Sequence, residues 1–220
     1  MAGPGAVESR EEWNVEKQPK RDLFSEKAQD WDENELVREL SSAIGGTILK
    51  QVPFDAQMTI LDFGAGTGLI SAQLAPRVGR IVAVDTSQAM LERLAAKPEL
   101  QGKVEAVCQD ITQAGLDRRF DRIVSAMAMH HVADTDRLIG TFAEHLKPGG
   151  LLAVADLDTE DGTFHPEDAQ GVHHHGFDRD ALAAILERHG FEDIRFVTAH
   201  TVNKEGREYP VFLVTAKKGG

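Results

Sequence analysis

The sequence has little of several features that mark other classes of protein. Among its 220 residues there is a single cysteine, Cys108, so no disulfide can form within the chain. We therefore expect a reducing compartment, the cytoplasm. No apolar run approaches the ~20 residues that span a bilayer, so we expect no membrane partner. Residues 1–20 also lack the basic start and apolar centre of a secretory signal.

Positive charge is scarce as well. The chain carries 24 Lys and Arg residues against 36 Asp and Glu residues, a formal net charge of −12. Nucleic-acid binding draws its affinity from neutralised phosphates, so we expect no nucleic-acid partner. A small or cationic substrate fits this balance more easily. Oligomeric state cannot be predicted from the sequence.

Short apolar runs alternate with amphipathic segments along most of the chain. We expect strands at 58–63, 80–85, 103–108, 120–126 and 150–157, and helices at 36–52, 68–78, 87–97 and 134–146. This alternation predicts a parallel sheet with helices on both faces. The alternation stops after a further helix at 178–190, because two strand-like runs follow at 192–202 and 209–218. The connector NKEGRE between them is too short for a parallel crossover, so these two strands must pair antiparallel. The predicted fold is a three-layer α/β sandwich whose seven-stranded sheet is mostly parallel, with an antiparallel last strand.

The stretch LDFGAGTG at 61–68 places glycine at every second position directly after a strand. A strand, a glycine-rich turn and a helix form a cradle for a nucleotide-like ligand, here residues Gly64, Ala65, Gly66 and Gly68. The dinucleotide fingerprint needs its third glycine one place later, where Leu69 stands. Asp62 would sit badly against a pyrophosphate, but it suits a ligand with an ammonium or sulfonium charge. A nicotinamide-dependent oxidoreductase is therefore the disfavoured alternative.

An acidic residue, Asp85, ends the second strand about twenty residues beyond the glycine turn, where a carboxylate can accept both ribose hydroxyls. The alternative is a helix N-cap, although Thr86 and Ser87 could cap the helix instead. On that helix, Met90 could line the adenosine pocket or belong to the core.

Five motifs in order resemble those of class I S-adenosylmethionine-dependent methyltransferases, in particular the small-molecule branch. They are LDFGAGTG, VAVDTSQAM (82–90), CQDI (108–111), FDRIVSAMAMHHV (120–132) and LKPGG (146–150). The resemblance implies a Rossmann-like fold and S-adenosyl-L-methionine as cofactor. It assigns Asp110 to the adenine amino group, Ile111 to one wall of the adenine slot, and Ala126 and Met127 to the loop beside the cofactor. FSEKAQDWDEN (24–34) is similar to the family's N-terminal cover, so we expect a tail at 1–20 and a single domain at 21–220 with a helical lid at about 21–52. In that lid, Phe24 and Trp31 could face a cationic ligand, or Trp31 could simply pack the lid onto the domain.

Histidines are the candidate acceptor-side residues. His130 and His131 follow the fourth strand, and either could act as a general base; the alternative is a structural ring bonded to a nearby carbonyl. Of the run His173, His174 and His175, at most the first and third share a face, so we expect no metal site and assign this run to the acceptor pocket. His145 and His189 end helices, and Cys108 is expected to be a buried strand residue.

The sequence thus predicts methyl transfer from S-adenosyl-L-methionine to a small-molecule nucleophile by in-line displacement. The acceptor atom, whether oxygen, nitrogen, sulfur or carbon, cannot be read from the fold. A protein that binds the cofactor without catalysis is the second alternative.

Overall fold

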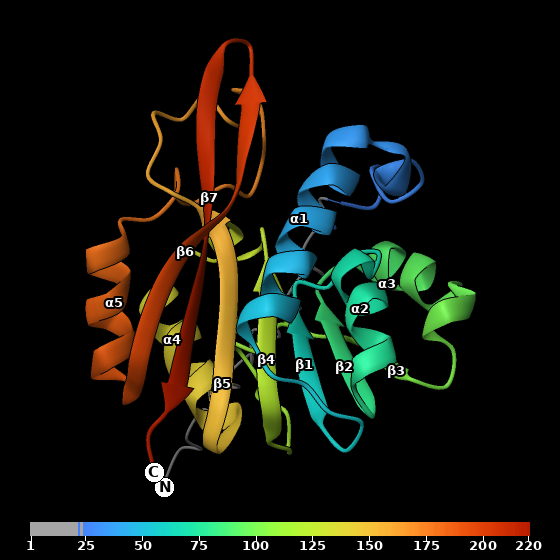
Figure 1. Ribbon diagram of the computed structural model, residues 1–220. Coiled ribbons are helices and arrows are strands. Elements are labelled where there is room, and N and C mark those ends of the chain that lie inside the picture. The colour runs from blue at the N-terminus through green and yellow to red at the C-terminus, as the bar shows by residue number, and fades with distance from the viewer. Residues whose placement is uncertain (1–21, 23) are drawn as a thin grey trace, which may run out of the picture.

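A seven-stranded sheet forms the centre of the molecule (Figure 1), with strand order β3-β2-β1-β4-β5-β7-β6. The structure, a computed structural model, describes Asp22 and residues 24–220, so the expected tail at 1–20 lies outside the described residues. The strands are β1 (Thr59–Phe63), β2 (Arg80–Asp85), β3 (Val104–Cys108), β4 (Phe120–Ala126), β5 (Leu146–Leu157), β6 (Phe191–Lys204) and β7 (Arg207–Lys218).

Strands β1 to β5 pair in parallel, whereas β7 runs antiparallel to both β5 and β6. The predicted sheet, mostly parallel with an antiparallel last strand, is confirmed. Its β6–β7 turn falls at Glu205 and Gly206, inside the short connector from which the antiparallel pairing was predicted.

Helices cover both faces of the sheet and complete the predicted three layers. They are α1 (Glu35–Gln51), α2 (Leu69–Leu74), α3 (Gln88–Ala95), α4 (Thr135–His145) and α5 (Arg179–Arg188). Residues of α1, α2 and α3 share one buried apolar cluster with Ile60 of β1, while α4 and α5 share the other with Leu61. Neighbouring residues of one strand point to opposite faces, so both clusters follow from the apolar strands. None of the described helices is long and apolar enough to span a membrane.

The two glycines of α1 do not break the helix. A Cβ at Gly45 would lie 2.4 Å from Gln73 Oε1 of α2, so the missing side chain lets the two helices approach. The predicted helix at 68–78 is shorter than expected, because α2 ends at Leu74 and a 3₁₀ turn at Ala75–Arg77 contains Pro76.

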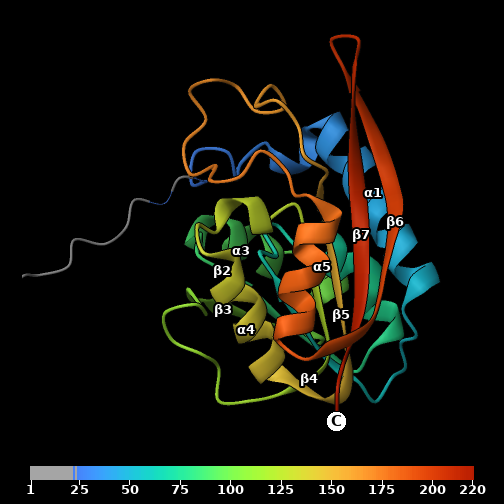
Figure 2. The same ribbon diagram turned by 90° about the vertical axis from the view of Figure 1, so that its left-hand side faces the viewer.

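Three segments extend beyond the carboxyl end of the parallel strands, which is the upper end of the sheet in Figure 1. They are the tip of the β6–β7 hairpin, the loop at 158–177 between β5 and α5, and the N-terminal segment at 24–34. Figure 2 shows the loop and the N-terminal segment at this same end in the turned view. Ligands of doubly wound sheets bind at the carboxyl ends of the strands, so these segments surround the expected site.

Candidate active site

The glycine turn links β1 to α2 in a conformation that glycine favours. Gly64 and Gly66 have φ values of +66° and +52°. A Cβ at Gly64 would lie 2.2 Å from the Ala128 Cβ, so this glycine lets the turn pack against the segment that follows β4. A Cβ at Gly66 would meet no atom within 4 Å, so the backbone there borders open space that a ligand can use.

Asp85 at the end of β2 is bound to the glycine turn. Its Oδ2 accepts a hydrogen bond from the Gly66 amide at 2.8 Å, and its Oδ1 accepts one from the Ser87 amide at 2.9 Å. The Ser87 hydroxyl accepts the Met90 amide at 3.3 Å and caps α3, so Asp85 is not the helix cap. Burial raises the pKa of Asp85, with a smaller contribution from Asp22. Each carboxylate oxygen has a further lone pair, which suits a pair of hydroxyl donors.

Asp62 is a buried acid beneath the same turn. It is 1% exposed, and its carboxylate accepts the Ser71 hydroxyl at 2.6 Å. Burial raises its pKa to about 7, the Ser71 hydrogen bond opposes that rise, and the charge of Asp85 adds to it. A cationic ligand nearby would stabilise the ionised carboxylate.

The N-terminal segment is attached to the elements around the turn. Asp22 accepts the Ser87 hydroxyl at 2.8 Å. Asp32 accepts the Thr67 hydroxyl and pairs with Lys97 Nζ at 2.7 Å. Arg93 of α3 adds a bond to the Ala28 carbonyl at 3.2 Å. The structure therefore places this segment across the carboxyl ends of β1 and β2.

Phe24 connects this cover with the residues after β4. Its ring lies 6.1 Å from the Trp31 ring and 5.2 Å from the His131 ring, both edge to face. Met127 has a φ of +55°, which is uncommon for a non-glycine residue and accompanies functional sites. Its amide donates to the Ala155 carbonyl at 2.9 Å, so β4 and β5 hold this conformation.

The segment after β3 contains the predicted adenine residues. Asp110 accepts the Thr112 amide at 3.1 Å and the Gln113 side chain at 2.7 Å, so its carboxylate stabilises its own turn. Ile111 is buried at 2% exposure. The expectation of a buried Cys108 is wrong, because this residue is exposed at the end of the edge strand β3.

Three histidine rings gather on the acceptor side, and we refer to His130, His131 and His165 as the histidine cluster. The ring of His130 lies 4.1 Å from that of His131 and 5.0 Å from that of His165, between centroids. His165 comes from the loop at 158–177, whereas the other two follow β4.

His130 forms a buried pair with Asp156 at the end of β5. Its Nδ1 lies 2.7 Å from Asp156 Oδ1, and the side chains are 2% and 0% exposed. Since the carboxylate also accepts the amides of His130 and Leu157, it is the acceptor and His130 Nδ1 is the donor. His130 Nε2 then carries the lone pair, and it is buried without a hydrogen-bond partner.

His131 and His165 stay neutral near physiological pH. Burial, with a smaller contribution from His130, lowers the pKa of each ring to about 4, and His131 also contributes to the lowering at His165. His131 Nδ1 donates to the Gly171 carbonyl at 2.8 Å, which is the carbonyl-bonded arrangement considered above as the structural alternative. Of the two candidate bases, only His130 has its Nδ1 bonded to a carboxylate.

The run His173–His175 is bonded to the segment after β4, because the His173 and His174 amides donate to the His130 carbonyl at 3.0 and 3.3 Å. His174 Nε2 lies 3.0 Å from the Val132 carbonyl and 3.2 Å from the Thr135 hydroxyl, so it ties the loop to the start of α4. His173 and His175 are exposed, and His175 Nδ1 lies 3.5 Å from Glu160 Oε1. No group of three or more His, Cys, Asp or Glu side chains that could hold a metal ion occurs in the described part of the chain.

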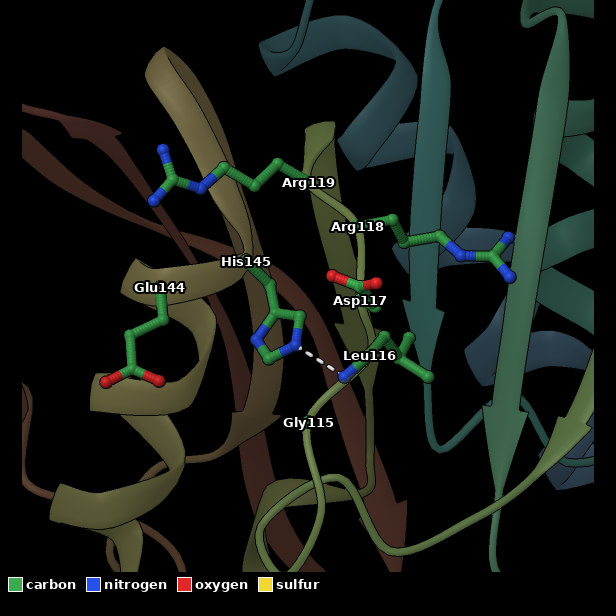
Figure 3. Close-up of a pocket in the computed structure, with 7 residues that line it drawn as sticks. All are labelled: Gly115, Leu116, Asp117, Arg118, Arg119, Glu144 and His145. Atoms are coloured by element: carbon green, nitrogen blue, oxygen red, sulfur yellow. Dashed lines mark hydrogen bonds between the residues drawn. The ribbon is translucent and has the colours of Figure 1, made fainter.

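A hollow at the opposite end of the sheet has a structural role. It is lined by Gly115, Leu116, Asp117, Arg118, Arg119, Glu144 and His145 (Figure 3). The His145 ring accepts the Leu116 amide through Nε2 at 2.8 Å and donates to the Thr141 carbonyl through Nδ1 at 2.7 Å. Both ring nitrogens are thus used to fasten the loop before β4 to the end of α4.

Comparisons with known proteins agree with this geometry. A family profile described as "Methyltransferase domain" matches residues 60–150. An uncharacterized methyltransferase of Schizosaccharomyces pombe is 38% identical over 135 residues, which are 54% of this chain and 48% of that protein. The chain thus spans about half the length of this relative. An uncharacterized methyltransferase of Oceanobacillus iheyensis is 30% identical over 180 residues, 78% of this chain and 82% of that protein. The solved N-methyltransferase NodS of Bradyrhizobium japonicum, in complex with S-adenosyl-L-homocysteine, has a TM-score of 0.68 at 17% identity over 91% of this chain and 100% of that one.

Together, the glycine turn, the acid at the end of β2 and the mostly parallel sheet define a Rossmann-like protein that binds a nucleotide-type cofactor. The chain belongs to the class I S-adenosylmethionine-dependent methyltransferase family. The resemblance inferred from the motifs is therefore confirmed.

Two groups of residues around the site were not predicted from the sequence. Asp22 and Asp32 fasten the N-terminal segment, Asp156 and His165 contact His130, and the charge of Glu160 acts on His165. Asp156 stands in an apolar strand, where a lone acid could have been singled out. His165 is an isolated loop histidine, and only its three-dimensional neighbours distinguish it.

Proposed function

We propose that the chain transfers a methyl group from S-adenosyl-L-methionine to a small molecule that carries an O–H, N–H or S–H group. When bound, this cofactor supplies a methyl group on a positively charged sulfur, and the sulfur keeps the electron pair of the broken bond. The chain's residues must then align the two substrates, exclude water and remove a proton.

The cofactor side of this proposal rests on three backbone and carboxylate features. We assign the ribose hydroxyls to Asp85 and the cationic part of the cofactor to Asp62, and Gly66 leaves room for its atoms. Their geometry fits, because Asp85 keeps free lone pairs and Asp62 is a buried acid with no cation bonded to it in the described structure. Ala65, Gly64 and Gly68 shape the turn, and Thr86, Met90, Asp110, Ile111, Ala126 and Met127 complete the proposed cofactor contacts. Phe24 and Trp31 cover it from the N-terminal lid, about 21–52.

The single observation that carries the acceptor side is the free Nε2 of His130. Asp156 fixes its tautomer and can stabilise the imidazolium that forms when Nε2 takes a proton. We propose His130 as the base, with Asp156 as its positioning residue and His131 as a wall of the pocket. We assign the chain to the cytoplasm, since its single cysteine is exposed and the chain holds no second cysteine with which it could form a disulfide.

Isothermal titration with S-adenosyl-L-methionine and S-adenosyl-L-homocysteine tests the cofactor half. We expect both to bind, and NADH not to bind. Absence of binding by either adenosyl compound at millimolar concentration would remove the proposal.

Incubation with tritiated donor and a fractionated metabolite extract tests the catalytic half. We expect a labelled small-molecule product in at least one fraction. Cofactor binding without a labelled product in any fraction would instead support a protein that binds the cofactor without catalysis.

A further inference from the structure

Unpartnered polar atoms concentrate on the acceptor side of the site. Within the described residues, four buried side-chain atoms have no hydrogen-bond partner: Ser125 Oγ, His130 Nε2, Glu160 Oε1 and His165 Nε2. Two of them belong to the histidine cluster, and Glu160 lies within electrostatic reach of His165. Buried polar groups are normally bonded, so a group of free ones indicates a place for a polar ligand.

Two of these atoms, His130 Nε2 and Glu160 Oε1, are hydrogen-bond acceptors. His130 Nε2 carries a lone pair, because its Nδ1 donates to Asp156. Glu160 Oε1 belongs to a carboxylate whose side chain is 7% exposed, and its Oε2 already accepts the amides of Thr163 and Phe164 at 2.8 and 3.1 Å. A carboxylate accepts hydrogen bonds and donates none. The ligand that satisfies these atoms must therefore bring hydrogen-bond donors.

The group nearest to the Glu160 carboxylate that could carry a positive charge is His175, whose side chain is exposed and whose Nδ1 lies 3.5 Å from Glu160 Oε1. Neighbouring cations are already directed at loop oxygens, since Lys204 donates to the Phe164 carbonyl and Arg207 to the Asp161 carboxylate, at 2.9 and 2.7 Å. Lys27 is exposed on the face of Phe24, 5.8 Å from the ring centroid. His131 and His165 are neutral, whereas Glu160 adds a buried carboxylate.

We propose that the methyl acceptor is a small amine, bound as its ammonium ion between Glu160 and the histidine cluster. This inference rests on the proposed function and narrows the acceptor from any protic group to nitrogen. An anionic acceptor lacks the hydrogen-bond donors that these atoms require, and the negative charge of Glu160 would repel it. An alcohol could satisfy one lone pair but not the carboxylate charge.

In this reaction His130 is the proton acceptor. The bound ammonium gives one proton to His130 Nε2, which frees the nitrogen lone pair. That lone pair forms the new nitrogen–methyl bond while the methyl–sulfur bond breaks and its electrons stay on sulfur. The products are a methylated ammonium, the neutral thioether and a protonated His130 beside Asp156.

Ligand-observed NMR on protein saturated with S-adenosyl-L-homocysteine tests this inference by binding alone. The probes are matched sets that differ only in the polar group: benzylamine with benzyl alcohol and benzoate, and ethanolamine with ethylene glycol and glycolate. We expect at least one amine to bind about tenfold more tightly than its alcohol and carboxylate counterparts. The inference is overturned when no amine binds, or when an alcohol or carboxylate binds as tightly as its amine.

The variant Glu160→Gln sharpens the test, because the amide retains an oxygen for the Thr163 and Phe164 amides but loses the charge. We expect the amine to bind about tenfold more weakly, with alcohol and S-adenosyl-L-homocysteine affinities unchanged. Glu208→Gln, at an exposed position near the start of β7, is the matched control and should change nothing.

A second variant separates ligand binding from the contact between Glu160 and His175. The alternative is that Glu160 affects amine binding only by holding the loop in place through His175. In that case His175→Ala would lower the affinity for the amine as much as Glu160→Gln does, and the inference would fail. We expect His175→Ala to leave the amine affinity unchanged. Retained S-adenosyl-L-homocysteine binding with no amine preference overturns this inference alone, whereas loss of cofactor binding by the unaltered chain overturns the proposed function.

Discussion

The cofactor side and the acceptor side of this site are built in different ways. The cofactor side uses one strand–turn–helix unit and the end of the next strand, and its key contacts are backbone amides bonded to Asp85. The acceptor side gathers side chains from the segment after β4, the end of β5 and the loop at 158–177. The first construction depends on backbone geometry within one short stretch of chain, whereas the second depends on side chains from three separate segments.

The two sides also differ in charge. Burial raises the pKa of both Asp62 and Asp85, and the charge of Asp85 adds to the rise at Asp62. Burial lowers the pKa of His131 and His165, so these two rings are neutral, whereas His130 is paired with the Asp156 carboxylate. Variants of one side should therefore leave the other side's measurements unaffected.

The largest effect is expected for Gly64→Ala on the cofactor side. An added Cβ would lie 2.2 Å from the Ala128 Cβ at a φ of +66°. The conformational cost alone is about 1–2 kcal/mol, and overpacking adds about 1–3 kcal/mol. Urea denaturation should show the combined loss, together with loss of S-adenosyl-L-homocysteine binding.

Gly206→Ala provides the control for Gly64→Ala. Its φ is +78°, but the new Cβ would meet no atom within 4 Å. It should cost about 1–2 kcal/mol without weakening the cofactor. Equal losses of stability in both variants would show that close packing of Gly64 against Ala128 contributes nothing.

The second effect concerns the base of the acceptor side. His130→Gln should lower the rate of methyl transfer about 10²–10⁴-fold, the usual contribution of a positioned base. Since this variant leaves Asp156 buried without its partner, the double variant His130→Gln/Asp156→Asn restores a neutral pair. We expect the double variant to be more stable and equally slow.

Titration with S-adenosyl-L-homocysteine verifies the fold of both His130 variants. His189→Gln, a histidine on the far end of α5, should retain the full rate. A His130→Gln enzyme with normal turnover would exclude His130 as the base and direct attention to His131.

The third effect is a pH dependence created by Asp62. Its pKa rises from 3.8 in the unfolded chain to about 7 in the folded one, so the folded state holds the proton more tightly. Unliganded protein should therefore lose stability as pH rises from about 4 to about 7, by about 2–4 kcal/mol in total. Asp62→Asn keeps a partner for Ser71 and should remove this loss, as urea denaturation at several pH values would show.

Asp62→Asn should weaken cofactor binding, although it removes the loss of stability at neutral pH. Without the carboxylate, the affinity for S-adenosyl-L-methionine at about pH 8 should fall about tenfold or more, since a charge-assisted contact is lost. Asp168→Asn, in the exposed part of the loop at 158–177, should alter neither stability nor affinity. A stability profile of Asp62→Asn that still declines toward neutral pH would contradict the assignment.

Sequence patterns were sufficient for the fold because each step depends on nearby residues. The apolar strands, the glycines at 64, 66 and 68, and the connector NKEGRE specify the parallel sheet, the turn and the final hairpin. The acceptor side depends on contacts between residues such as His130 and His165, which are distant in sequence. The run His173–His175 was the more conspicuous pattern, yet in the described structure the His174 ring contacts the Val132 carbonyl, the Thr135 hydroxyl and the Phe177 ring.

The smallest effect tests how the hairpin supports the acceptor side. The Tyr209 hydroxyl lies 2.7 Å from the Thr163 hydroxyl, and its ring lies 5.3 Å from that of Phe164, next to His165. Tyr209→Phe keeps the ring contact and removes about 1 kcal/mol of hydrogen bonding. Hydrogen exchange at the Thr163 and Phe164 amides should then be about fivefold faster, with no change at the Gly66 amide or in S-adenosyl-L-homocysteine affinity. Equal acceleration at Gly66 would mean that the hairpin stabilises the whole carboxyl edge of the sheet, so that the two sides are not independent.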